Sequence, residues 1–233
     1  MTRWLEVDPE RIDRWVAGFT ERHGATDRTT DGPRLLLSAA DGARASLTPF
    51  AASGTPPVMG EGLAQWAAPP AALGLVLVRR GGYAVGRAEG RTLTSHKCGT
   101  RYVQSRTAAG GWSQQRFARR RGNQAEALVG SVVEHVIRII IPAPGSPPSA
   151  LVVGGDRALV RDVLADRRLA ALARLPRREL WNLPDPRLEV LRQAVGRGRS
   201  VRIGIDEPLS RGTLVPDEER DSPDARARGG SGT

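Results

Sequence analysis

The sequence has few residues of several types that often decide a fold. Its 233 residues include one cysteine, Cys98, and only 4% are aromatic. One cysteine cannot form an internal disulfide, and low cysteine usage is typical of a reducing cytoplasm. There is no stretch of about 18 consecutive apolar residues, and charged residues at Arg3, Glu6 and Asp8 interrupt the start. We therefore expect a cytoplasmic protein without a membrane span or a signal peptide.

Negative charge is also scarce, both in total and along one stretch. The chain has 35 basic and 25 acidic residues, which gives a net charge of +10. Lys97 is the one lysine, so 35 − 1 leaves 34 arginines. No Asp or Glu occurs between Gly90 and Ala125. A basic surface favours a polyanionic partner, and without a membrane signal we expect that partner to be nucleic acid.

The stretch without acids contains a glycine pair, Gly110 and Gly111, shortly before a run of arginines. Between the pair and the arginines stand Trp112 and two glutamines, Gln114 and Gln115. The arginines without an acidic neighbour are Arg101, Arg106, Arg116, Arg119, Arg120 and Arg121. Solvated helix faces usually alternate opposite charges at i, i+4 spacing, so we favour contact with RNA over a solvated face. Trp112 can stack on a base.

Residues 1–68 predict a small α+β unit. Asp8 and Pro9 are the residue types preferred at an N-cap and at the first helical position, and apolar residues then recur at i, i+3, i+4 and i+7. The predicted elements are a helix over 9–23 and two strands over 34–39 and 43–49, joined by an Asp-Gly turn. Residues 51–70 are rich in Pro, Gly and Ala, so we expect a loop or linker there.

Residues 69–208 predict the main domain. An apolar run over 73–78 indicates a buried strand, which opens a three-stranded meander with 100–106 as a possible fourth strand. The later predicted elements are helices over 115–139, 157–165, 169–175 and 186–195, and strands over 150–153 and 179–183. The helix over 115–139 is cationic in its first half and apolar in its second, so we expect it to dock by the second half. The fold predicted is α/β, with a mixed sheet flanked by helices.

Two other groups of residues have simpler interpretations. His96 and Cys98 stand close together, but zinc needs three or four ligands at short spacing, so we predict no metal and no cofactor. Gly154, Gly155 and Asp156 follow a predicted strand and open a helix, a geometry that can bind phosphate. Because the G-x-G-x-x-G pattern and a P-loop lysine are both missing, we favour a turn with Asp156 as the N-cap.

Over residues 110–121 the sequence resembles the middle domain of eukaryotic and archaeal class-one peptide-release factors. That domain carries a Gly-Gly-Gln tip followed by the pattern R-F-A-R-x-R, and this pattern stands intact at 116–121. The order of predicted strands and helices is similar over residues 70–205. The resemblance implies a ribonuclease-H-like sheet for this domain and a role in releasing peptide from tRNA.

One departure from that pattern resembles a narrower family. Trp112 follows the glycines, and the glutamines come two and three places later. This arrangement is similar to the Vms-like release factor (VLRF) family, and especially to its actinobacterial branch. The resemblance implies that Gln114 is the displaced catalytic residue, with Gln115 as the second candidate. Since no codon-reading domain is recognisable, it also implies codon-independent release of stalled chains from peptidyl-tRNA on the large ribosomal subunit.

The reaction implied by the resemblance is hydrolysis of the ester between the peptide and the tRNA ribose. The backbone of Gly110 and Gly111 is expected to donate N–H groups to the developing oxyanion, while a glutamine orients the water. Proton transfer is left to ribosomal RNA and the ribose, which fits the absence of Asp and Glu near Gln114. We expect a monomer that binds ribosomal RNA and peptidyl-tRNA.

Two other functions fit the same residues and stay open at this point. An endonuclease that cuts the tRNA acceptor end would also free the nascent chain. A non-catalytic factor that binds the ribosome or RNA would carry an inert glutamine. The first alternative is another enzyme, and the second is a binding protein.

The sequence predicts that residues 209–233 are disordered and contribute little to stability. They have no periodic apolar face, and their polar composition, rich in Pro and Gly, is typical of disorder. Removing 209–233 should therefore leave the melting temperature unchanged when the full and shortened chains are unfolded thermally. A clear fall of Tm in the shortened chain would show that this segment packs on the body.

Overall fold

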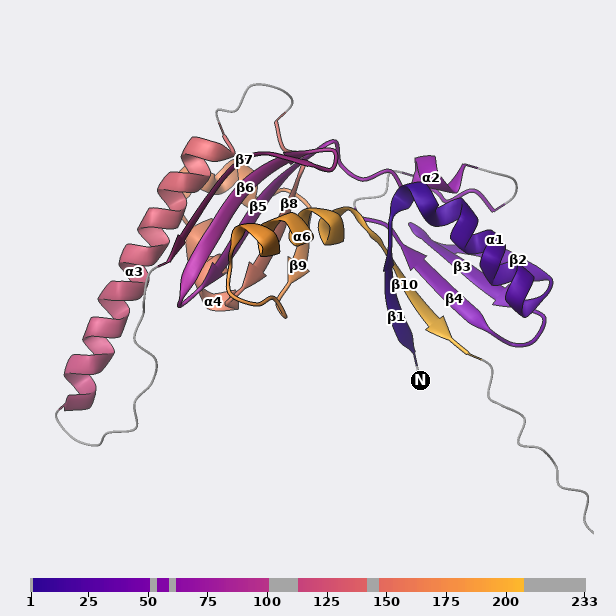
Figure 1. Cartoon of the computed structure of the whole chain (residues 1–233), viewed down its shortest axis with the longest axis horizontal. Helices are drawn as coiled ribbons and strands as arrows, with labels where there is room; N and C mark the ends of the chain where they lie inside the picture. The colour runs from indigo at the N-terminus through magenta and orange to yellow at the C-terminus, as the bar shows by residue number, and fades with distance from the viewer. Residues whose placement is uncertain (1, 51–53, 59–61, 101–112, 142–146, 208–233) are drawn as a thin grey trace, which may run out of the picture.

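The computed structural model describes residues 2–50, 54–58, 62–100, 113–141 and 147–207. For residues 113–121 it describes the backbone alone. Within the described residues the chain forms two five-stranded sheets, each with helices packed on it (Figure 1). We call the sheet that contains the N-terminal strand, with its helices, the first unit, and the other sheet, with its helices, the second unit. No helix among the described residues is long and apolar enough to cross a membrane.

The first sheet is antiparallel and has the strand order β1-β10-β4-β3-β2. Its strands are β1 (Arg3–Val7), β2 (Thr26–Asp31), β3 (Arg34–Ala39), β4 (Arg44–Thr48) and β10 (Val201–Asp206). The helices of this unit are η1 (Pro9–Arg11), α1 (Ile12–His23) and α2 (Leu63–Trp66). They bury apolar side chains of α1, such as Val16 and Phe19, against Leu35 and Leu47 of the sheet. The helix predicted over 9–23 and the two strands that follow it are therefore confirmed.

The short helix α2 lies inside the segment predicted as a linker, so that prediction is wrong for residues 63–66. Asp13 of α1 caps it, because its carboxylate accepts hydrogen bonds from the backbone N–H groups of Leu63 and Ala64, both at 3.2 Å. Leu63 and Trp66 are buried in the core of the first unit. The cap comes from 50 positions earlier in the chain, so the local sequence does not show it.

The strand that completes the first sheet comes from the far end of the described chain. In β10, Ile203 lies opposite Leu5 of β1 on one side and opposite Leu47 of β4 on the other. The predicted boundary after residue 68 assigns 201–206 to the second unit, whereas these residues lie in the first sheet. The division into 1–68 and 69–208 as folding domains stays a prediction. The strand β2 was not predicted because its sequence, TDRTTD, has no apolar residue.

The second sheet is mixed and has the strand order β7-β6-β5-β8-β9. Its strands are β5 (Ala72–Arg79), β6 (Gly82–Glu89), β7 (Thr92–Thr100), β8 (Ala150–Gly155) and β9 (Arg177–Leu180). The first three form an antiparallel meander, and β8 and β9 run parallel to β5. The helices of this unit are α3 (Ser113–Ile139), α4 (Arg157–Leu164), η2 (Arg167–Leu169), α5 (Ala170–Ala173) and α6 (Leu188–Arg199).

Helices cover both faces of the second sheet, which explains its apolar strands. Side chains of α3 and α4 pack in the core on one face, and side chains of α6 pack in the core on the other. Because β5 is buried on both sides, it reads as a near-continuous apolar run rather than an alternating one. The predicted α/β fold, with a mixed sheet flanked by helices, is confirmed.

Most predicted elements of the second unit are present with shifted ends. The long helix begins at residue 113 rather than 115, and α6 continues to 199 rather than 195. The strand predicted over 179–183 instead spans 177–180. The possible strand over 100–106 and the segment predicted to be disordered, 209–233, lie outside the described residues, apart from Thr100 at the end of β7.

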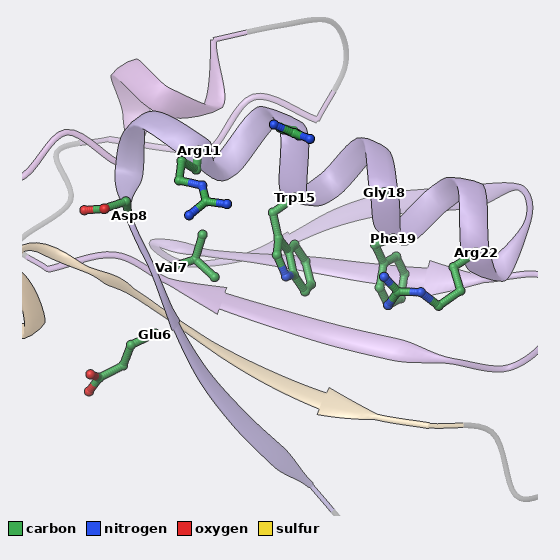
Figure 2. Close-up of a pocket in the computed structure, with 9 residues that line it drawn as sticks. Glu6, Val7, Asp8, Arg11, Trp15, Gly18, Phe19 and Arg22 are labelled. Atoms are coloured by element: carbon green, nitrogen blue, oxygen red, sulfur yellow. The ribbon is translucent and has the colours of Figure 1, made fainter.

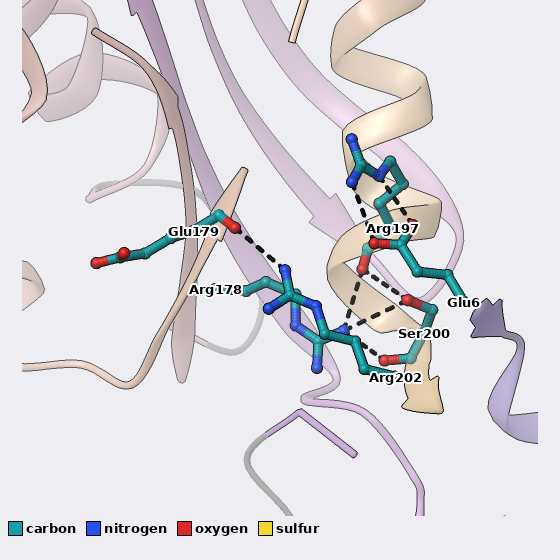
Figure 3. Close-up of polar contacts among 6 residues, drawn as sticks. All are labelled: Glu6, Arg178, Glu179, Arg197, Ser200 and Arg202. Carbon is teal, nitrogen blue, oxygen red and sulfur yellow. Dashed lines mark hydrogen bonds and ion pairs between the residues drawn. The ribbon is translucent and has the colours of Figure 1, made fainter. Parts of the chain in front are cut away.

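Arginines join the two units beside β10 (Figure 3). Arg197, near the end of α6, donates two hydrogen bonds to the carboxylate of Glu6 on β1, at 2.8 and 3.1 Å. Arg178 of β9 is buried and donates to the backbone oxygens of Arg197, at 3.2 Å, and Ser200. Two further contacts of this kind run from Arg202 to the backbone oxygen of Glu179 at 3.1 Å and from Arg199 to Glu10 at 2.9 Å. We call these contacts the arginine seam.

The second half of α3 holds that helix on the sheet. Its fully or nearly fully buried side chains are Leu128, Val132, Val133, Val136 and Ile139. His135 stacks on Tyr83 of β6, with ring centroids 5.3 Å apart. Gly99 of β7 leaves room for this tyrosine, because a Cβ there would lie 2.5 Å from the ring. Burial, aided by the charges of Arg138 and Lys97, lowers the pKa of His135 below its usual value.

Replacing Ile203 with Ala tests the contribution of β10 to the first unit. Ile203 is 0% exposed, and truncating a buried isoleucine to alanine typically costs about 2–5 kcal/mol of unfolding free energy. The matched control is Ile141→Ala, where the side chain is 46% exposed and the cost should be about 0.5 kcal/mol or less. Denaturant unfolding of both variants measures the difference. Equal costs would contradict the burial of β10.

Lowering the pH should destabilise the protein through His135. Its pKa is lowered in the folded state, so below the unfolded-state value of about 6.5 the unfolded chain binds more protons and stability falls. His135→Phe keeps an aromatic ring against Tyr83 but cannot titrate. The fall of Tm between pH 7.5 and pH 5.5 should therefore be smaller in His135→Phe than in the wild type or in His96→Gln, which removes an exposed histidine. An equal fall in all three proteins would contradict this role.

Candidate functional site

The predicted site residues lie in and just before α3. β7 ends at Thr100 and α3 begins at Ser113. The predicted residues that fall outside the described part of the chain are Arg106, Gly110, Gly111 and Trp112. Those placed in the first turns of α3 are Gln114, Gln115, Arg116, Arg119, Arg120 and Arg121. The structure therefore brings both glutamines and four arginines together on the backbone of one helix.

A helix start of this composition attracts anions. The first N–H groups of any α-helix have no partner within the helix, and the helix dipole adds a partial positive charge at this end. The first turn of α3 has no acidic residue, and the first acid along the helix is Glu126. No acidic residue on this part of α3 therefore offsets its arginines, and a helix start of this charge is complementary to a polyanion.

The charged part of α3 extends beyond the sheet. Ala125 is the first residue of the helix that packs on the core of the second unit, among those with described side chains. Residues 113–124 precede it, and at 1.5 Å per residue they span about 18 Å. Figure 1 shows this end of α3 running away from β5, β6 and β7. The apolar half thus fixes the helix, and the arginine-rich half projects from the body.

Two more arginines lie at the end of the sheet from which the chain leads toward α3. Gly82 pairs with Thr100, so the turn between β5 and β6 lies beside the end of β7. Arg79 and Arg80 in this turn are each within 4.0 Å of a carboxylate. Ion pairs that are this exposed contribute little to stability. These contacts therefore hold the two side chains only weakly.

The turn after β8 is a helix cap rather than an anion site. The carboxylate of Asp156 accepts hydrogen bonds from the backbone N–H groups of Ala158, at 2.9 Å, and Leu159, at 3.3 Å. Gly155 has a φ of 99°, and a Cβ there would lie 2.1 Å from the backbone oxygen of Val78, so only glycine fits. The predicted cap is confirmed, and its negative charge disfavours phosphate at this helix start.

His96 and Cys98 have no further ligand beside them among the described residues. Within that part of the chain, no group of three or more His, Cys, Asp or Glu side chains could hold a metal ion. Burial raises the pKa of the Cys98 thiol, and its side chain packs against the core on the α6 side of the sheet. A protonated, half-buried thiol is a weak ligand and a weak nucleophile.

The residues that orient α3 were not found from the sequence. Tyr83, Gly99 and His135 come from three different elements, and only the fold brings them together. One signal was present, because His135 is a polar residue beside the apolar face of the helix, three positions after Val132. Such a residue often marks a specific contact of the helix with its sheet.

Comparison with known proteins bears directly on this geometry. A family model described as Actinobacteria/chloroflexi VLRF1 release factor matches residues 71–204. The matched span runs from the start of β5 into β10 and includes all of α3. A search of curated proteins finds no match. Since the family model covers more than half of the chain, the protein belongs to the Actinobacteria/chloroflexi VLRF1 release factor family, as the glycine, glutamine and arginine pattern predicted.

Proposed function

We propose that this release-factor family member is a peptidyl-tRNA hydrolase that rescues stalled ribosomes. It acts as a cytoplasmic monomer on the large ribosomal subunit, without reading a codon. The observation that carries the proposal is the coincidence of the family match with one sequence feature at the start of α3. There Gln114 stands three positions after Gly111, and no acidic residue occurs from 91 to 124.

The reaction is hydrolysis of the ester that joins the nascent chain to the tRNA ribose. The oxygen of a water molecule bonds to the ester carbonyl carbon, and the bond from that carbon to the ribose oxygen breaks. One proton of the water passes to the ribose oxygen and the other is lost to solvent, so the products are a peptide carboxylate and a tRNA with a free hydroxyl. Gly110 and Gly111 lack a Cβ and let the backbone approach the ester, where N–H groups stabilise the oxyanion. Gln114 orients the water.

The two glutamines are not equivalent in this reaction. Successive positions of an α-helix lie about 100° apart around its axis, so positions 114 and 115 cannot present the same group to one ester. Gln114 is nearer the glycine pair and fits the displaced glutamine of the family pattern. Gln115 is adjacent to Arg116, in the part of α3 that we assign to phosphate contacts.

The way α3 is anchored supports such a role. Catalysis by positioning requires that the reacting groups sit on a rigid support. The buried second half of α3 and the stack of His135 on Tyr83 supply that support on the sheet. The arginines between the anchor and the glutamines, from Arg116 to Arg121, then bind phosphates of ribosomal RNA or of the tRNA acceptor end.

Replacing each glutamine separately tests the assignment. Gln114→Ala should lower the rate of release on the order of 100-fold or more, because it removes a group that orients the water. Gln115→Ala is the matched control and should cost much less. The measurement is single-turnover release from large subunits that carry peptidyl-tRNA, at saturating enzyme, with sedimentation to confirm that both variants still bind.

Each other outcome of this experiment has a definite meaning. If Gln115→Ala is the inactive variant, the loop is catalytic but the residue assignment is wrong. If neither variant slows release, the start of α3 is not the active site. If the wild type binds the subunit but releases no peptide above background, the protein is a non-catalytic binding factor.

A further inference from the structure

A groove with free positive charge lies in the first unit, outside the span of the family match (Figure 2). It runs between one side of α1 and the end of β1, and its volume is about 390 Å³. Pockets of about 300–1,000 Å³ are the usual size for small-molecule sites. Its charged lining residues are Glu6, Asp8, Arg11, Arg14 and Arg22, and its aromatic ones are Trp15 and Phe19. We call it the α1 groove.

The arginines of the α1 groove share one side of the helix. Arg11, Arg14 and Arg22 stand at i, i+3 and i+11, which places them on a single face. Among the described residues, none of the three has a hydrogen bond or an ion pair to an acidic side chain. In Figure 2 the guanidinium groups of Arg11 and Arg22 flank Trp15 and Phe19. The groove therefore has cationic groups on both sides of an aromatic centre.

The acids near this groove are occupied by other partners. Glu6 accepts two hydrogen bonds from Arg197, and Asp8 lies 3.0 Å from Arg91. Asp13 of α1 caps α2. Glu21 is the remaining acid of α1, and it is exposed. The charge that remains available along this face is therefore mainly positive.

The floor of the groove is aromatic and open. Trp15 is half-buried, and its ring stacks on Phe19 with centroids 5.7 Å apart and planes 23° apart. Gly18 leaves space beside the rings, because a Cβ there would meet no atom within 4 Å. A flat ring beside open space, with arginines on both sides, is the combination by which proteins stack a base and hold its phosphates.

We propose that the α1 groove binds single-stranded RNA, with a base at Trp15 and the neighbouring phosphates at Arg11 and Arg22. An acidic protein would match the charge, whereas a base with its neighbouring phosphates uses the ring and the arginines together. Figure 1 shows α1 and α3 at opposite ends of the molecule. The groove thus gives the protein a second RNA contact, far from α3 and independent of whether the start of α3 is catalytic.

The test measures binding of the full chain to a fluorescently labelled single-stranded RNA of 12 nucleotides, by anisotropy at several salt concentrations. Arg11→Gln combined with Arg22→Gln should flatten the plot of log affinity against log salt by about 1.4, since each lost contact to a single strand removes about 0.7. The matched control combines Arg34→Gln with Arg44→Gln, which removes two exposed arginines from β3 and β4. It should change the slope by less than half as much.

A second variant separates binding from folding. In Gly18→Leu the added Cβ meets no atom within 4 Å, and leucine is the better helix former, so Tm should stay equal or rise. Affinity for the RNA should fall on the order of tenfold, because loss of a base stack has that effect. Single-turnover release at saturating enzyme should stay at the wild-type rate, which distinguishes this inference from the proposed hydrolysis.

Three results would overturn the inference. Wild-type affinity in both Gly18→Leu and the Arg11 and Arg22 double variant would show that the groove does not bind RNA. An equal change of slope in the Arg34 and Arg44 control would show diffuse attraction to the whole unit. Competition by polyglutamate as strong as competition by unlabelled RNA would assign the groove to an acidic protein partner instead.

Discussion

The arrangement of the whole molecule depends on β10 lying between β1 and β4. This strand belongs to the sheet of the first unit, yet one residue, Ser200, separates it from α6 of the second unit. A strand with a partner on each side cannot shift without breaking both ladders. The backbone therefore crosses between the units next to a strand that β1 and β4 hold from both sides. The orientation of one unit thus sets that of the other.

Arg178 strengthens this crossing point. It is buried and donates to the backbone oxygens of Arg197 and Ser200, and its guanidinium lies 5.0 Å from the ring centroid of Phe50. Burial, together with the nearby charge of Arg202, lowers its pKa to about 10, so it remains charged at neutral pH. Carbonyl oxygens at the end of a helix carry partial negative charge, which suits a buried cation. Together with the hydrogen bonds from Arg197 to Glu6, this contact ties the end of α6 to β9 and to β1.

The arginine-rich half of α3 projects from a body whose two units are fixed to each other. Like charges that are close together repel one another, and a helix start rich in arginine costs stability unless an anion is bound. The second half of α3 offsets this cost in stability through its buried apolar side chains and through the stack of His135 on Tyr83. The match to a release-factor family includes this helix start. In the function that we propose, phosphates of RNA neutralise this repulsion on binding.

The sequence predicted those helices and strands that are determined by residues close together in the chain. Helix α1 and the long helix α3 followed from apolar spacing, and β5 from its apolar run. The strand β10 was missed because its partners, β1 and β4, are far away in sequence, and α2 was missed because Asp13 supplies its cap from α1. These contacts exist only in the folded chain.

The two candidate binding sites differ in the same way. One is formed by a contiguous stretch of sequence, and the other depends on contacts that exist only in the fold. The glycines, glutamines and arginines form one contiguous stretch, so the family resemblance was visible at once. The α1 groove was not visible, because Arg11, Arg14 and Arg22 alternate with Glu10, Asp13 and Glu21 and the helix reads as balanced. Only the fold shows that Glu10 and Asp13 are committed to Arg91, Arg199 and the start of α2.

The state of the tRNA after release tests the central claim most directly. Large ribosomal subunits that carry peptidyl-tRNA are incubated with the protein, and the 3′ end of the released tRNA is analysed by electrophoresis and by recharging with its amino acid. Ester hydrolysis predicts a full-length tRNA with an intact CCA end that can be charged again. A tRNA shortened at its acceptor end would contradict hydrolysis of the ester and would identify the protein as a nuclease.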